Sequence, residues 1–430
     1  MRQTISLVMI ARDEERFISE ALESASAWAD ELIVLDTGSR DRTVELARAA
    51  GAQVHHFEWR DDFAAARNAS LSYARSDWVA VLDADERFVT DSPERVHELL
   101  QRTKAWPYQA LMLRLENYSL EGALRSVTRA PRIFPRHPDL GYEGRIHENL
   151  GSLSRGDEQG LSLIRCEGLK LIHYGYDPQL AISRGKSERN MRLLRRAYEQ
   201  APEQRRYAFY LAKEHELIGE DELAERAYRE ALEGGDSAGR PLRISAYAGL
   251  LRCLRHRRAA PLERLAQAVE ALELSPESAD FWLELSRCYS ALGQPEEELA
   301  SLLQSLERIE GDPLYFGSEA LVHRAQLRVA AGQRLWDQGH REEALPHLRE
   351  AIKDSSLSPE LFALALERLC YQLLEQGRWP ELKALCPALL LAHERGLAVT
   401  RELLLALKQC GEGPIAQALS MELTRLQSTL

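Results

Sequence analysis

The stretch ELIVLDTGSRDRTVELARAAGAQV (31–54) predicts the architecture of the N-terminal part of the chain. It opens with the apolar run ELIVL (31–35), which is typical of a buried strand. A helical pattern follows over Thr43–Ala50, with Asp41 placed to cap its start. A second strand-like run, AQVHHF, comes next at 52–57. A strand, a helix and a strand in this order form a βαβ unit, which predicts a parallel sheet.

The same alternation continues on both sides of this unit. Strand-like runs occupy 4–10 and 78–82, and helical patterns occupy Glu14–Ser26 and Ala64–Ala74. Because strands recur with a helix between them, we expect a right-handed, doubly wound α/β sheet. Ligands bind at the carboxyl ends of the strands in such sheets. Residues 106–176 instead contain short strands, many arginines and turn residues, which predicts an antiparallel extension with long loops.

Acidic residues stand where two of the predicted strands end. Asp36 follows 31–35, and Asp83 and Asp85 follow the run WVAVL at 78–82. Two neighbouring carboxylates repel each other unless a cation lies between them. Mg²⁺ and Mn²⁺ prefer oxygen ligands and often bridge to the phosphates of a substrate. The sequence therefore predicts a divalent metal ion and a phosphorylated ligand at this edge of the sheet, with a solvated turn as the alternative.

Beyond about residue 180 the strand patterns disappear, and Ala, Leu, Glu and Arg recur at helical spacing. Similar helical segments follow Gly219, Gly293 and Gly339, and a weaker copy surrounds Gly377. Helix–turn–helix units of about 34 residues with a small residue at the turn are the tetratricopeptide (TPR) pattern. We therefore expect TPR-like repeats here, with an unrelated helical bundle as the alternative.

These patterns divide the chain into two expected domains. An α/β domain covers 1–178, and an all-α, TPR-like helical repeat domain covers 179–430. Stacked helical repeats present a concave surface that suits a peptide or protein partner. A homodimer formed through the repeat region is a second expected use of this surface.

The composition argues against several other classes of protein. The sequence contains 55 basic and 67 acidic residues, so its net charge is −12. A nucleic-acid partner would require a surplus of Lys and Arg. No apolar run reaches the roughly 20 residues of a transmembrane helix, and residues 1–15 lack the pattern of a signal peptide. We therefore expect a cytoplasmic protein. The sequence contains no CxxC pair, no GxGxxG after 4–10 and no GxxxxGK[ST], so zinc, dinucleotide and P-loop sites are not expected.

Three segments resemble glycosyltransferases of family 2, which have the GT-A fold: ISLVMIARDEERFISEAL (5–22), ADELIVLDTGSRDRTVELARAAGAQV (29–54) and DDFAAARNASLSYARSDWVAVLDADE (61–86). The resemblance covers roughly 4–176. Within this family the chain is most similar to a branch with a TPR tail, which includes peptide S- and O-glycosyltransferases of the glycocin type. A related branch without the tail adds glucose to the lipopolysaccharide core.

The resemblance implies roles for the residues at the strand ends. The segment from Ile10 through Arg12 to Asp13 matches the part of the family that lines the nucleoside, although Asp13 replaces the usual Asn. Asp36 matches the acid that hydrogen-bonds the uracil ring of a UDP-sugar, with capping of the following turn as the alternative. Arg67 matches a basic residue near the nucleotide, with an exposed helix position as the alternative.

The resemblance also implies a metal site. Asp85 matches the direct metal ligand, and Asp83 matches an acid on the side of the ribose or the metal. His173, in the strand-like LIHYGY (171–176), resembles the histidine that completes the metal shell in many GT-A enzymes. A histidine satisfied inside the core is the alternative for this position.

The stretch RAPRIFPRHPDLGYEGRIHENL (129–150) supplies the remaining candidates. A departing diphosphate needs cationic cover, for which Arg132 is the preferred residue and a solvated loop the alternative. Inversion at the anomeric carbon needs a base on the face opposite the diphosphate. The resemblance assigns this base to Glu148, with Glu143 as second choice. Three alternatives stay open for His147: it orients Glu148, it contacts the acceptor, or it is packed in the structure without a role in the reaction.

Together these expectations describe a metal-dependent inverting glycosyltransferase. It uses Mn²⁺ or Mg²⁺ and a UDP-sugar donor, and it modifies a Ser/Thr or Cys side chain of a peptide or protein held by the helical repeats. A lipopolysaccharide or other cell-envelope glycan is the alternative acceptor. A non-enzymatic TPR scaffold is the second alternative.

Overall fold

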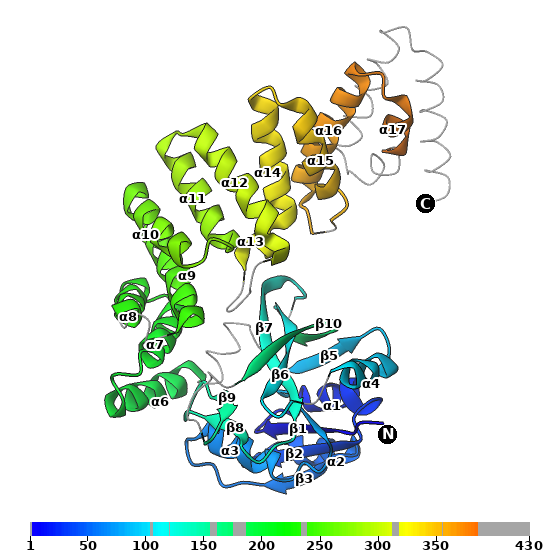
Figure 1. The fold of residues 1–430 in the computed structure, drawn as a ribbon, viewed down its shortest axis with the longest axis vertical. Coiled ribbons are helices and arrows are strands. Elements are labelled where there is room, and N and C mark those ends of the chain that lie inside the picture. The colour runs from blue at the N-terminus through cyan, green and yellow to red at the C-terminus, as the bar shows by residue number, and fades with distance from the viewer. Residues whose placement is uncertain are drawn as a thin grey trace. The chain divides into compact units, whose positions relative to one another are not determined.

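The structure is a computed structural model that describes residues 2–103, 106–119, 121–154, 161–174, 186–233, 239–311, 318–354 and 356–385 (Figure 1). The chain forms two compact units. The first comprises Met1–Ala259 with Pro313–Ser318, and the second comprises Ala260–Asp312 with Glu319–Leu430. The first helices after the expected boundary at 178 thus belong to the same compact unit as the sheet. The boundary itself stays a prediction.

An eight-stranded mixed sheet lies at the centre of the first unit, with the order β3-β2-β1-β4-β7-β6-β10-β5. Four neighbouring strands are parallel: β1 (Ile5–Ala11), β2 (Glu31–Asp36), β3 (Gln53–His56) and β4 (Trp78–Val81). The others are β5 (Glu86–Thr90), β6 (Gln109–Tyr118), β7 (Leu124–Pro135) and β10 (Ser162–His173). A separate hairpin consists of β8 (Leu140–Glu143) and β9 (Asn149–Ser152).

The parallel half of the sheet confirms the prediction made from strand and helix alternation. All four predicted strands form, and their ends differ from the expected ones by at most one residue. Every residue of β4 is buried, as expected for a parallel strand that is covered on both faces. The expected antiparallel extension is present in β7, which pairs antiparallel with β4 and β6. β10, however, pairs parallel with β6, and the short strand β5 was not anticipated.

Eight described helices belong to the first unit: α1 (Ile18–Ser26), α2 (Thr43–Ala49), α3 (Phe63–Leu71), α4 (Pro93–Arg102), α6 (Lys186–Gln200), α7 (Arg206–Leu217), α8 (Asp221–Glu233) and α9 (Arg240–His256). Asp41 accepts a hydrogen bond from the Thr43 backbone N–H at 2.9 Å at the start of α2, but Arg42, and not Asp41, occupies the N-cap position. Asp62 caps α3 by accepting from the Ala65 N–H at 2.9 Å. This cap fixes the start of the helix that carries Arg67.

The described part of the second unit is helical. Its helices are α10 (Pro261–Leu274), α11 (Ala279–Leu292), α12 (Pro295–Arg308), the 3₁₀ turn η3 (Ile309–Gly311), α13 (Glu319–Val322), α14 (Arg324–Asp337), α15 (Arg341–Ala351), α16 (Pro359–Glu375) and α17 (Trp379–Ala384). None of the described helices is both long and apolar enough to cross a membrane. Cys386 and Cys410 lie outside the described residues, whereas the other four cysteines are buried and free.

The glycines singled out in the sequence lie at turns between paired helices. Gly219, Gly293, Gly339 and Gly377 all have positive φ, between 64° and 87°. After Gly293, for example, the N–H of Gln294 bonds to the carbonyl of a residue five positions earlier at 3.0 Å. This arrangement is the Schellman motif, which ends a helix with a left-handed residue. The TPR-like prediction is therefore confirmed at the turns.

One further turn of this kind has no glycine. Arg258 follows α9 with φ 55°, and the N–H of Ala259 bonds to the Leu254 carbonyl at 2.9 Å. A non-glycine residue in the left-handed region is uncommon, so an alignment of glycines overlooks this turn. Its position between Gly219 and Gly293 explains why those two glycines are separated by twice the usual repeat length.

Gly249 of α9 allows close packing against α8. A Cβ atom at position 249 would lie 2.1 Å from Cζ of Tyr228, a fully buried side chain. Replacing a helical glycine by alanine ordinarily stabilises a helix by about 1 kcal/mol. We expect Gly249→Ala instead to lower the free energy of unfolding by about 1–3 kcal/mol, because the ring must move. Urea unfolding measures this change, and a Tyr228→Leu background should remove most of it. A stabilised Gly249→Ala protein would contradict the described packing.

Candidate functional site

The carboxyl ends of β1, β2 and β4 open onto a cavity of about 520 Å³. The wall also includes α3, the segment before β9, the end of β10 and the start of α6. Eight of the ten residues predicted from the sequence line it: Ile10, Arg12, Arg67, Asp83, Asp85, His147, Glu148 and His173. Asp36 and Arg132 are not part of this lining. The topology thus brings residues from distant parts of the chain to the strand ends, where ligands bind in sheets of this kind.

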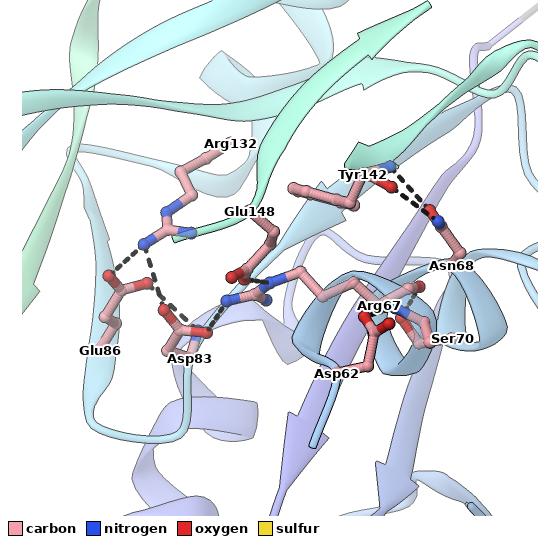
Figure 2. A network of polar contacts seen from close by, with 10 residues as sticks. Asp62, Arg67, Asn68, Ser70, Asp83, Glu86, Arg132, Tyr142 and Glu148 are labelled. Atoms are coloured by element: carbon pink, nitrogen blue, oxygen red, sulfur yellow. Dashed lines mark hydrogen bonds and ion pairs between the residues drawn. The ribbon is translucent and has the colours of Figure 1, made fainter. Parts of the chain in front are cut away.

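Arg67 lies between two carboxylates of the cavity (Figure 2). Its Nη2 atom donates to Oδ1 of Asp83 at 2.8 Å, and its Nε atom donates to Oε1 of Glu148. Burial opposes the charge of this guanidinium, but Asp83 and Glu148 raise the pKa of Arg67 well above its usual value. Arg67 is only 9% exposed, so the alternative of an exposed helix position is wrong. Its contact with a nucleotide stays a prediction.

Arg132 of β7 forms the other side of this network. Its Nη2 atom lies 3.3 Å from Oδ2 of Asp83 and also donates to Oε1 of the buried Glu86 (Figure 2). Burial tends to raise the pKa of Asp83, but Arg67 and Arg132 outweigh it and hold that pKa well below its usual range. Burial raises the pKa of Glu86, although Arg132 acts against it. Arg132 therefore supports Asp83 from behind the cavity wall.

Asp85 and His173 form a second, separate pair. Nε2 of His173 lies 3.5 Å from Oδ2 of Asp85. The other ring nitrogen, Nδ1, is 2.7 Å from Oδ1 of Asn117, on the neighbouring strand β6. Burial lowers the pKa of His173, but the hydrogen bond and charge of Asp85 raise it above its usual value. The Asn117 contact orients the ring, and Nε2 lies on the side of Asp85; a hydrogen bond on the other ring nitrogen is also common among metal-binding histidines.

The donors fit a metal ion held by two protein side chains rather than three. Among the residues that the structure describes, no group of three or more His, Cys, Asp or Glu side chains is placed to hold a metal ion. Both carboxylate oxygens of Asp83 face arginines, whereas Oδ2 of Asp85 and Nε2 of His173 lie 3.5 Å apart, close enough for one ion to contact both. Mg²⁺ is commonly held by one or two carboxylates, with substrate phosphates and water as the remaining ligands. Asp85 fits this pattern, and His173 adds one imidazole nitrogen beside it.

Glu148 is carried by the connection between β8 and β9, and the helices that follow the sheet hold this connection in place. His147 has φ 51°, and its ring stacks on Tyr210 of α7 with the centroids 3.8 Å apart and the planes within 7°. Ile146 packs in a cluster with Leu193 and Leu194 of α6. Helices α6 and α7 thus fix the backbone that presents Glu148 to the cavity.

His147 is half-buried, and its ring is held in the neutral form. Its Nε2 atom has no hydrogen-bond partner among the described residues, and burial together with Lys213 lowers the pKa of His147 to about 3. Between pH 6.5 and 3 the unfolded chain binds a proton that the folded protein does not, so stability falls as the pH falls. We expect a loss of about 2 kcal/mol from this residue between pH 7 and pH 5.

Urea unfolding of the wild type and of His147→Phe at the two pH values measures this loss. The phenyl ring keeps the stacking on Tyr210 but cannot be protonated, so the variant should lose less stability on acidification. If the free energy of unfolding of the two proteins depended equally on pH, the folded protein would not hold His147 in its neutral form.

Asp36 lies at the end of β2 and caps the turn that follows. Its Oδ1 accepts from the Ser39 N–H at 3.1 Å, and its Oδ2 accepts from the Gly38 N–H at 3.2 Å and lies 3.2 Å from Nδ1 of His56. The neighbouring residue Thr37, and not Asp36, is part of the cavity wall. The alternative of turn capping thus describes its contacts, and the contact with a nucleobase stays a prediction.

Several lining residues were not predicted from the sequence. They are Glu14, Thr37, Trp59, Phe63, Ala84, Ile146, Arg189 and Asn190. The place of Thr37 in the cavity wall could have been predicted, because it is the next residue after Asp36 at the end of β2. Arg189 and Asn190 come from α6, which has an ordinary helical pattern, so only the packing of the chain places them at the cavity. Glu143, the second candidate for the base, lines a different cavity between α3, β8, α6 and α7.

Comparison with known proteins agrees with this architecture. The family model of glycosyl transferase family 2 matches residues 6–167. A TPR repeat-containing protein of Synechococcus elongatus is 32% identical over 299 residues, which cover 67% of this chain and 72% of that protein. The SPbeta prophage-derived glycosyltransferase SunS of Bacillus subtilis is 27% identical over 224 residues. The matched region covers about half of each of these two chains, 51% in both.

Two solved structures show partial similarity. The TPR protein YrrB, described as having an unusual peptide-binding site, has 19% identity and a TM-score of 0.34, covering 53% of this chain and 97% of YrrB. Glucosyl-3-phosphoglycerate synthase of Mycobacterium tuberculosis, solved with Mn²⁺, UDP and phosphoglyceric acid, has 28% identity and a TM-score of 0.21. That match covers 28% of this chain and 44% of the synthase.

A mixed GT-A-like sheet with acids at its strand ends, followed by TPR-like helices, defines a glycosyltransferase with a helical repeat region. The N-terminal part of the chain, residues 6–167, is a glycosyl transferase family 2 domain. The alternative of a non-enzymatic scaffold is thereby set aside.

Proposed function

We propose that the protein is a metal-dependent inverting glycosyltransferase that moves a sugar from a UDP-sugar to a Ser/Thr or Cys side chain of a peptide or protein. The observation that carries the proposal is that two groups of side chains with different roles line one cavity. The pair Asp85–His173 offers ligands for a metal, while Arg67 holds Glu148 and Asp83 a short distance apart.

Glu148 is the proposed base. Its carboxylate accepts a hydrogen bond from Arg67 on one oxygen, which leaves the other available to an acceptor hydroxyl or thiol. As the acceptor attacks the anomeric carbon, Glu148 takes its proton, and the bond to the diphosphate breaks on the opposite face. The segment that presents Glu148 is held by α6 and α7, so the base is fixed before the acceptor arrives.

Asp85 and His173 are the proposed ligands of Mn²⁺ or Mg²⁺. The ion, when bound, would neutralise negative charge on the departing diphosphate. Asp83, which was expected to share in the metal, is instead proposed to orient Arg67, because its two oxygens face Arg67 and Arg132. Asp36 and the segment from Ile10 to Arg12 are proposed to bind the nucleoside.

A peptide or protein acceptor is supported by the helices of the second unit. The described helices there have TPR-type turns, and stacked repeats of this kind form surfaces that bind peptides. Self-association through the repeat region is the second proposed use of these helices.

Mass spectrometry tests the proposal directly. The protein is incubated with Mn²⁺, a panel of UDP-sugars and a library of peptides that contain Ser, Thr or Cys, beside the Asp85→Ala protein as control. We expect one UDP-sugar to add a hexose-type mass to a subset of peptides with the wild type only. Transfer to envelope glycans but to no peptide would favour the alternative acceptor, and no use of any UDP-sugar would contradict the donor.

A further inference from the structure

Helix α6 places an arginine in the wall of the catalytic cavity. Arg189 lies in the first turns of α6, and its guanidinium carbon stands 5.3 Å from the centroid of the Phe63 ring. Its Nη2 atom donates to Oδ1 of Asn190 at 3.2 Å. Asn190 in turn donates to the buried Glu214 of α7 at 2.9 Å. Arg189 is thus held against an aromatic ring by a chain of contacts that ends on the next helix.

This guanidinium has unused hydrogen-bond donors. Its Nε atom is buried and has no partner among the described residues, and no described carboxylate forms an ion pair with it. Arg192, one turn further along α6, shows the ordinary arrangement, because it pairs with Asp61 at 3.0 Å. A buried donor without a partner costs free energy. A ligand that accepts hydrogen bonds in the cavity would remove this cost.

Arg12 brings a second guanidinium group to the cavity that Arg189 lines. Burial lowers the pKa of Arg189, and the charges of Arg12 and Arg192 lower it further, whereas those of Glu214 and Asp61 raise it. Arg12 lines the same cavity at the end of β1, and its nearest carboxylate, Asp13, is 3.8 Å away. Two guanidinium groups that face one cavity repel each other unless a negative group lies between them. Phosphate oxygens match the planar donor fork of arginine.

We propose that Arg189, together with Arg12, binds the diphosphate of the donor nucleotide, an assignment that rests on the proposed use of a nucleotide sugar. The two arginines and the Asp85–His173 pair line the same cavity, so the proposed diphosphate site and the proposed metal site lie in one cavity. Helix α6 is then part of the donor site as well as a link to the helical region. An arginine outside the family-model match at 6–167 becomes necessary for donor binding.

Calorimetric titration tests this assignment with three probes: UDP, uridine and inorganic pyrophosphate, each in the presence of Mg²⁺. Arg189→Met keeps an apolar chain over Phe63 but removes the charge and the donors. We expect Kd for UDP and for pyrophosphate to rise about 10- to 100-fold, as for a lost charge-assisted hydrogen bond, with Kd for uridine unchanged. Arg189→Lys should give an intermediate Kd for UDP and for pyrophosphate, because lysine keeps the positive charge but lacks the planar set of donors of the guanidinium group.

Arg195→Ala is the matched control, because this exposed arginine lies on the same helix. It should bind all three probes as the wild type does, and thermal denaturation without ligand checks that each variant folds. Unchanged UDP binding in Arg189→Met, or an equal loss for uridine, would overturn the assignment. A rise in acceptor KM alone would also overturn it. Binding of pyrophosphate but not UDP by the wild type would refute the UDP donor and leave the anion site standing, and binding of neither would refute both.

Discussion

The Glu148→Gln protein is expected to lose about 10³-fold in kcat, since a positioned base contributes roughly 10²- to 10⁴-fold. The carboxamide oxygen can still accept the hydrogen bond from Arg67, so the network around Asp83 should survive. Binding of the donor should therefore stay within about twofold of the wild-type value, because the change affects proton removal and not binding. Initial rates of sugar transfer and titration with UDP measure the two quantities separately.

Glu143→Gln is the informative comparison for this variant. Glu143 lies on β8 and lines a different cavity from Glu148, although it was the second candidate for the base. We expect its transfer rate to resemble that of the wild type. If Glu143→Gln loses activity while Glu148→Gln keeps it, the assignment of the base is wrong.

The Asp85→Asn protein is expected to lose at least about 10³-fold in transfer, which corresponds to about 4 kcal/mol. The amide carries no negative charge, so the pair with His173 becomes a poor ligand set for a divalent ion. Stabilisation of the protein by UDP should then no longer depend on Mn²⁺. Transfer rates and thermal denaturation, each with and without Mn²⁺, measure these two effects.

Asp83→Asn separates the two acids of the DAD sequence. Asp83 contacts Arg67 and Arg132, so its neutralisation leaves both guanidiniums without this carboxylate partner. We expect a loss of about 1–3 kcal/mol in stability, whereas the response to Mn²⁺ should persist. The reverse result, in which Asp83→Asn abolishes the Mn²⁺ response and Asp85→Asn does not, would exchange the two roles.

The parallel half of the fold was predictable because its signals are local. Each strand is a short apolar run, and the carboxyl ends of adjacent parallel strands necessarily meet at one edge, which placed Asp83 and Asp85, after β4, beside the segment from Ile10 to Arg12, at the end of β1. The separation of their roles was not predictable. It depends on Arg67 and Arg132, which reach Asp83 from a helix and from a strand far away in the sequence.

The contribution of the helices to the cavity needed the three-dimensional structure. Nothing in the helical pattern of α6 marks Arg189, and nothing in α7 marks Tyr210 as the partner of His147. The repeat turns were visible where glycine supplies the left-handed residue, but Arg258 adopts the same conformation without that mark. Asp36 was predicted to belong to the site because it ends a strand, but its side chain is not part of the cavity wall.

Thermal denaturation with UDP-sugars, in Mn²⁺ or in chelator, tests the central claim of a metal-dependent donor site most directly. A ligand at 100 times its Kd stabilises the folded state by about 2.7 kcal/mol, which is readily measured as a shift in Tm. We expect at least one UDP-sugar to raise Tm with Mn²⁺, no shift with chelator, and no Mn²⁺-dependent shift in Asp85→Asn. Equal shifts in chelator, or no shift with any UDP-sugar, would contradict the account.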